Sequence, residues 1–149
     1  MDDEVKVVSA ERVIAASPEA VFELIADPEQ QPRWDGNDNL AAAEPGQRVR
    51  GVGDVFTMRL TMGEDRENHV VEFEEGRRIA WLPAPAGAET PGHLWRWELA
   101  PLADGRTLVR HTYDWRGLTD PDRVSTARAT TESSLHASID RLAALAEQG

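Results

Sequence analysis

The sequence from Pro121 to Glu147, PDRVSTARATTESSLHASIDRLAALAE, has no proline after its first residue and contains no glycine. Apolar side chains recur in it at the three- and four-residue spacings that share one face of a helix: Leu135, Ile139, Leu142 and Leu145. Asp120 suits an N-cap, and Pro121 suits the first helical turn. The sequence therefore predicts one long helix over residues 121–147.

The two halves of this predicted helix differ in character. The second half carries Leu and Ile, whereas the first half carries small or weakly polar side chains: Thr126, Ala127, Thr130, Thr131 and Ser134. An apolar helix face packs into a core, and small side chains leave room beside them. We therefore expect the preceding chain to wrap this helix as a sheet, with a ligand space beside residues 126–134.

Two predicted strands with aromatic faces come before the helix, over residues 93–99 and 107–115. Because side chains alternate between the faces of a strand, one face collects the apolar and aromatic residues and the other the charges. The aromatic faces carry Trp95, Trp97 and Leu99 in the first strand and Val109, His111, Tyr113 and Trp115 in the second. Asp104-Gly105 between the two strands is typical of a tight turn. We expect both aromatic faces to point toward the terminal helix.

The earlier part of the chain shows the same alternation. It predicts strands over residues 5–16, 54–62, 67–74 and 78–82, and a helix that begins at the N-cap Ser17. Residues 83–92 have three prolines and two glycines and are predicted to form a loop, with His93 exposed beside it. The order of strand, helices, antiparallel strands and long helix is that of an α+β fold.

Composition limits the class of protein. The 149 residues fit a single domain over 1–149, and no segment approaches the roughly 20 apolar residues of a membrane span. The acidic start, residues 1–4, does not resemble a secretion signal, and the absence of cysteine excludes disulfides. A cytoplasmic location is therefore expected, with no membrane insertion.

The net charge of −11 argues against several classes of partner. Such a surface repels nucleic-acid phosphates and anionic lipids, so we expect no nucleic-acid partner. The histidines are far apart in sequence and no His-x-x-x-His or Cys pair exists, so no metal site is predicted. Without a phosphate-binding loop, no cofactor is predicted either.

Several motifs resemble the START-like (SRPBCC) superfamily, most closely its polyketide cyclase/dehydrase and lipid-transport group. The residues that carry the resemblance are VIAASPEAVF at 13–22, Asp27-Pro28, Trp34, Gly53-Asp54, Trp97-Glu98-Leu99 and GRTLV at 105–109. The resemblance implies a helix-grip fold, in which a curved antiparallel sheet of about seven strands wraps the C-terminal helix and two short helices close one end. It also implies a cavity for an apolar or aromatic molecule. The family has no common catalytic motif, so no catalytic residue is carried over.

The predicted ligand site lies between the inward faces of the strands and the first half of the helix. Its candidate residues are Phe56, Met58, Leu60, His69, Val71, Phe73, Trp81, Trp95, Trp97, His111, Tyr113, Ala127, Thr130, Thr131 and Ser134. Buried polar groups need partners, so His111 and Tyr113 either line the pocket, satisfy each other or the core, or act as acid and base.

Three functions remain open at this point. The first is a carrier or sensor that binds a small hydrophobic or aromatic molecule. The second is a polyketide cyclase or dehydratase with His111 and Tyr113 as acid-base groups. The third is a protein-interaction module of the Hsp90-activator type. The chain is expected to be a monomer or a homodimer.

Overall fold

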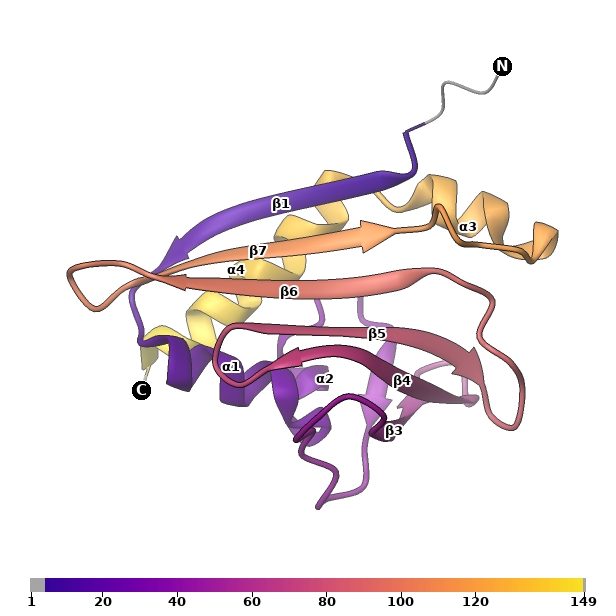
Figure 1. Cartoon of the computed structure of the whole chain (residues 1–149), viewed down its shortest axis with the longest axis horizontal. Helices are drawn as coiled ribbons and strands as arrows, with labels where there is room; N and C mark the ends of the chain where they lie inside the picture. Colours follow the sequence, from indigo (N-terminus) through magenta and orange to yellow (C-terminus); the bar gives the residue numbers. More distant parts are fainter. Residues whose placement is uncertain (1–4, 149) are drawn as a thin grey trace.

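A seven-stranded antiparallel sheet with helices on one side makes up the fold (Figure 1). The computed structural model describes residues 5–148, so the acidic start at residues 1–4 lies outside the described part. The elements in chain order are β1 (Val7–Ile14), α1 (Pro18–Ala26), η1 (Pro28–Gln30), α2 (Gln31–Trp34), β2 (Leu40–Ala42), β3 (Val55–Leu60), β4 (Asp65–Glu74), β5 (Arg78–Pro85), β6 (Leu94–Pro101), β7 (Thr107–Asp114), η2 (Pro121–Arg123), α3 (Val124–Ala129) and α4 (Glu132–Gln148).

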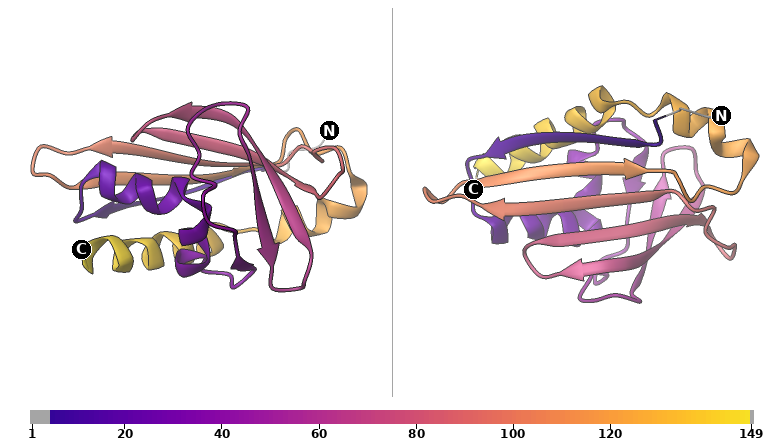
Figure 2. Two further views of the ribbon diagram at one scale, coloured as in Figure 1. Left: turned by 90° about the horizontal axis from the view of Figure 1, so that it is seen from below. Right: turned by 45° about the horizontal axis from the view of Figure 1, so that its top comes forward.

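The strand order across the sheet is β1-β7-β6-β5-β4-β3-β2. Figure 2 shows the β3–β5 end of the sheet turned steeply against β6 and β7, with the helices on the concave side. This arrangement confirms the α+β helix-grip fold. No helix of residues 5–148 is long and apolar enough to cross a membrane.

The N-terminal helix begins where the sequence predicts. Ser17 caps α1, because its hydroxyl accepts a hydrogen bond from the Ala20 amide at 3.2 Å. Val21, Phe22 and Ile25 turn inward and are buried. The indole N–H of Trp34 donates to the carbonyl of Leu24 at 2.7 Å, so α2 is tied to α1.

The prediction of one continuous helix over 121–147 is wrong, because α3 and α4 are separate helices (Figure 1). Thr130 leaves the helical conformation with φ −78° and ψ 117°. The next residue, Thr131, pairs with Ser134: the Ser134 amide donates to the Thr131 hydroxyl at 3.3 Å, and the Thr131 amide donates to the Ser134 hydroxyl at 3.4 Å. This reciprocal pair satisfies amides that a new helix start leaves open, and α4 therefore begins at Glu132.

The apolar half of the prediction is confirmed. Leu135, Ile139 and Leu142 of α4 are fully buried, and α4 packs against β1, α1, α2 and β7. Gly36 approaches α4 so closely that its amide donates to the Ser138 hydroxyl at 3.0 Å. The C-terminal helix thus fixes both the sheet and the segment after α2.

Strand β4 contains a bulge, and its side chains face as predicted only after that bulge. The register shifts between Val70 and Glu72, so Val70 faces inward before the bulge and Phe73 faces inward after it, in edge-to-face contact with Phe22. The prediction that His69 and Val71 face inward is wrong. Val71 is 39% exposed, and His69 lies opposite the exposed Val55.

Candidate functional site

A cavity of about 630 Å³ lies between the concave side of the sheet and the segments that follow β7. Strands β2 to β7, helix α2, η2, α3 and the start of α4 all contribute to its lining. The predicted site residues that line it are Met58, Leu60, Trp81, Trp95, Trp97, His111, Tyr113, Thr130 and Ser134. Neighbouring antiparallel strands bring those of β3 and β5–β7 onto one face, because directly opposite residues share a face of the sheet, while Thr130 and Ser134 come from the end of α3 and from α4.

The other predicted residues lie elsewhere. Phe56, Phe73 and Ala127 pack in or against the core beside the cavity, Thr131 is exposed at the start of α4, and His69 and Val71 lie on the outer face. Thr131 therefore serves the helix start. The small side chains of α3 that line the cavity are Thr126 and Ala129.

A row of aromatic rings forms one side of the cavity. The imidazole of His111 stacks on the Trp97 ring, with 3.7 Å between centroids and 11° between planes. Two residues further along the same two strands, the ring centroids of Trp95 and Tyr113 lie 4.4 Å apart. The register explains both contacts, since Trp97 is opposite His111 and Trp95 is opposite Tyr113. Trp34 closes the row with an edge-to-face contact to Trp97 at 5.2 Å.

His111 is a buried polar side chain without a protein partner. Only 4% of the residue is exposed, and neither ring nitrogen has a hydrogen-bond partner among the described residues. Burial lowers the pKa of His111 to about 3, so the ring is neutral at physiological pH. A neutral imidazole offers one donor and one acceptor. The donor and the acceptor of His111 are thus both unpaired within residues 5–148, and both nitrogens are buried behind the cavity lining.

At the other end of the aromatic row lies His93, which was not among the predicted site residues. His93 lines the cavity, 6.0 Å from the Tyr113 ring, and the prediction that it is exposed is wrong. Its Nδ1 is buried and lacks a hydrogen-bond partner within residues 5–148. Burial, with smaller contributions from the charges of Arg123 and Arg66, lowers the pKa of His93 to about 4. Burial also raises the pKa of Tyr113 to about 12, against the opposing charge of Arg123.

Both arginines line the cavity and were also missed. Arg66 faces inward because it lies opposite the buried Met58 in the β3–β4 register. Arg123 comes from η2 and is paired with Asp120 at 3.4 Å. The alternation along β4 does identify the face that carries Arg66, but this face is the opposite of the one that was predicted to point inward.

Two further polar lining residues, Gln31 and Asp35, hold the surrounding backbone. The Gln31 side-chain amide donates to the carbonyl of Ile25 at 3.0 Å. The Asp35 carboxylate accepts from the backbone amides of Asn37, Asn39 and Leu40 at 2.7–3.2 Å, which holds the loop before β2.

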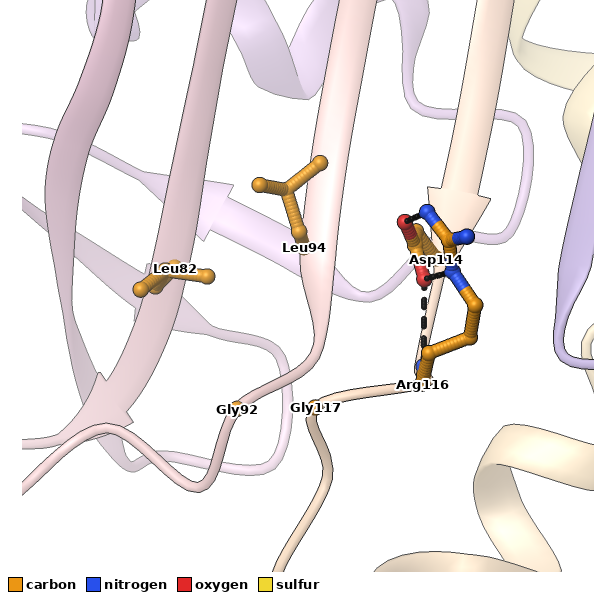
Figure 3. Close-up of a pocket in the computed structure, with 6 residues that line it drawn as sticks. All are labelled: Leu82, Gly92, Leu94, Asp114, Arg116 and Gly117. Carbon is orange, nitrogen blue, oxygen red and sulfur yellow. Dashed lines mark hydrogen bonds and ion pairs between the residues drawn. The ribbon is translucent and has the colours of Figure 1, made fainter.

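A second depression lies on the outer face of the sheet (Figure 3). It is lined by Leu82, Gly92, Leu94, Asp114, Arg116 and Gly117. Arg116 is paired with Asp114 at 2.7 Å, and the depression is open to solvent. Its polar side chains already satisfy each other, so the concave cavity is the better candidate site. No group of three or more possible metal ligands occurs in the part of the chain that the structure describes.

Residues 6–147 match the family model described as polyketide cyclase / dehydrase and lipid transport. The chain belongs to this family. Membership in the polyketide cyclase / dehydrase and lipid-transport family, of START-like (SRPBCC) fold, confirms the resemblance seen in the sequence.

Solved structures share the fold of this family member at low sequence identity. Protein MLL2253 from Mesorhizobium loti has a TM-score of 0.70 at 17% identity, and CV1439 from Chromobacterium violaceum has 0.65 at 22%; each match covers 95% of this chain and 97% of the other. The Aha1 dimer from Colwellia psychrerythraea has a TM-score of 0.66 at 18% identity, over 96% of this chain and 97% of the other. A search of curated proteins gave no significant match.

Proposed function

We propose that the protein binds a small hydrophobic or aromatic molecule in the concave cavity, as a carrier or sensor. The observation that carries the proposal is the cavity of about 630 Å³ lined by Trp81, Trp95 and Trp97. Ligand pockets of this kind span about 300–1,000 Å³ and combine apolar walls with a few polar groups. Tryptophan rings offer large flat surfaces on which a planar molecule stacks.

The pKa values of His111 and Tyr113 favour binding over catalysis. A proton-transfer residue works best when its pKa lies near the working pH. His111, with a pKa of about 3, is a weak base, and Tyr113, with a pKa of about 12, stays protonated. Neither group is suited to proton transfer near neutral pH, so the cyclase alternative is not the function that we propose.

The interaction-module alternative has less support. Four of the five tryptophans are buried, at 4% exposure or less for three of them and 6% for Trp81, so the aromatic side chains do not form an outer docking surface. The Aha1 likeness, at 18% identity, shows the fold alone. A monomer or a homodimer stays a prediction for this chain.

Ligand binding is tested on freshly purified protein. We expect native mass spectrometry to detect a co-purified small molecule, or tryptophan fluorescence to change on titration with two- and three-ring aromatic compounds, because the cavity is lined by indoles. Protein unfolded in urea serves as the control for non-specific quenching. Absence of both a bound molecule and a saturable fluorescence change would contradict the proposal.

A matched pair of variants ties binding to the cavity. Ser134→Leu and Thr131→Leu each remove one of the two reciprocal backbone-to-hydroxyl bonds that begin α4, so each is expected to lower the unfolding free energy by about 1 kcal/mol. Of the two residues, Ser134 lines the cavity and Thr131 does not, so only Ser134→Leu should weaken binding. We expect its dissociation constant to rise tenfold or more, which corresponds to a loss of about 1.4 kcal/mol of binding free energy. Urea unfolding and fluorescence titration measure the two effects. Equal dissociation constants for the two variants would show that the ligand does not bind in this cavity.

A further inference from the structure

The charge of the cavity lining is opposite in sign to that of the whole molecule. The chain has a net charge of −11, yet the ionisable cations of the described lining are Arg66 and Arg123, and its single acid is Asp35. The Asp35 carboxylate is already engaged by three backbone amides. The lining therefore presents two arginine side chains inside an acidic protein, although each is also paired with a carboxylate outside the lining.

The two arginines gather at one end of the cavity, beside His93. Arg66 lies opposite Pro85, at the end of β5 from which the chain runs on to His93. The segment that leads to Arg123 is held at Pro91, two residues before His93, by the Thr119 amide at 2.8 Å. Their side chains are shielded from solvent, with 18% of Arg66 and 28% of Arg123 exposed. Shielding from water strengthens the attraction of such a cation for an anion.

Each arginine keeps donors for another partner. Arg66 pairs with Glu64 through Nη1 at 3.2 Å, and Arg123 pairs with Asp120 through Nε at 3.4 Å. A guanidinium has five N–H donors, so these single contacts leave several uncommitted. The buried Nδ1 of His93 and the protonated hydroxyl of Tyr113 add neutral polar groups at the same end.

The other parts of the lining are apolar or aromatic. Trp97, Trp81 and Met58 are buried along the sheet side of the cavity. The cavity thus has an aromatic body and a cationic end, a division that suits a molecule with the same two parts. Carboxylates bind arginine through paired N–H donors, which gives orientation as well as affinity.

We propose that the ligand of this cavity is a planar aromatic acid whose carboxylate binds Arg66 and Arg123 at the His93 end while its rings lie against Trp95 and Trp97. This inference rests on the proposed function, since it names the class of molecule that the same site holds. The acidic outer surface repels anions at long range, so the two arginines select the acid at contact distance.

The test compares three aromatic acids with their neutral amides by isothermal titration calorimetry: benzoate, 2-naphthoate and anthracene-2-carboxylate, each against its primary carboxamide. We expect the best acid to bind at least tenfold more tightly than its amide, because a charge-assisted hydrogen bond is lost in the amide. Arg66→Gln and Arg123→Gln should each weaken the acid about tenfold and change binding of the amide less than about twofold.

Arg59→Gln is the matched control, since Arg59 pairs with Asp65 on the exposed side of β3 and is absent from the cavity lining. It should leave both affinities unchanged, and thermal melting verifies that all three variants fold. An amide that binds as tightly as its acid, or arginine variants that bind the acid like wild type, would overturn the acid inference while the proposed function stands. If no acid and no amide binds, the proposed function fails and this inference falls with it.

Discussion

Lowering the pH from 7.5 to 5 is expected to reduce the unfolding free energy by about 4 kcal/mol, through the two histidines that line the cavity. His111 and His93 have pKa values of about 3 and about 4 in the folded protein, below the ordinary value of 6.5. In the unfolded chain both rings take up protons as the pH falls below 6.5, while the folded state holds them neutral. The unfolded state therefore binds more protons, and stability is lost as the pH falls through this window. Each histidine contributes about 2 kcal/mol at pH 5, at 1.36 kcal/mol per pKa unit.

The measurement is urea unfolding followed by tryptophan fluorescence at pH 5, 6 and 7.5. His111→Phe keeps a ring that stacks on Trp97 and removes one titrating group. The unfolding free energy of this variant should therefore fall by only about 2 kcal/mol between pH 7.5 and 5. His136→Gln is the control, since His136 is partly exposed on α4 and should retain the full loss. The carboxylates of Glu72 and Asp114 have lowered pKa values, so they take up protons, and cost stability, mainly below pH 5. Equal unfolding free energies at pH 5 and 7.5 in the wild type would contradict the prediction.

Gly92→Ala is expected to lower the unfolding free energy by about 3 kcal/mol or more, from backbone strain and a steric clash together. Gly92 has φ +114°, and a Cβ on it would lie 1.9 Å from the carbonyl oxygen of Gly117. Figure 3 shows the two glycines side by side where the segments before β6 and after β7 meet. These segments are held together by Thr119, whose amide and hydroxyl donate to the carbonyl of Pro91 at 2.8 and 3.1 Å. Because the atoms that this Cβ would strike belong to the Gly117 backbone, one of the two segments must move.

Gly87→Ala separates the two contributions. Gly87 lies in the same β5–β6 connection with φ +77°, but no atom lies within 4 Å of the place that a Cβ on it would occupy. It should show only the cost of a left-handed backbone, about 1–2 kcal/mol. Since His93 follows Gly92, ligand binding should also weaken in Gly92→Ala and not in Gly87→Ala. A Gly92→Ala protein as stable as Gly87→Ala would show that the two segments separate freely.

The sequence predicted the sheet faces best where alternation runs without interruption. In β6 and β7, Trp97 and His111 face the same side as expected, and direct pairing brings them together. In β4 the rule failed for two physical reasons. A bulge after Val70 shifts the phase, and polar residues such as Arg66 and Asn68 face inward because they line a cavity. A hydrophobic pattern does not anticipate a polar interior.

The helix break and the position of His93 were beyond sequence reasoning for different reasons. Thr130 and Thr131 are ordinary helix residues in composition, and the break depends on the hydrogen bonds between Thr131 and Ser134. His93 lies next to a loop, where no periodicity assigns a side chain to either face. Its burial follows from the contact between Gly92 and Gly117, which are 25 residues apart in the sequence.

The separate start of α4 has a consequence for how such a protein can be altered. Because α4 has its own capping pair, the core residues from Leu135 onward do not depend on the helical continuity of residues 121–130. The latter segment carries Arg123, Thr126 and Ala129 to the cavity. Selection or engineering can therefore change residues 121–130, and with them the ligand preference, while the folding core is conserved. Specificity and stability can thus evolve independently of each other.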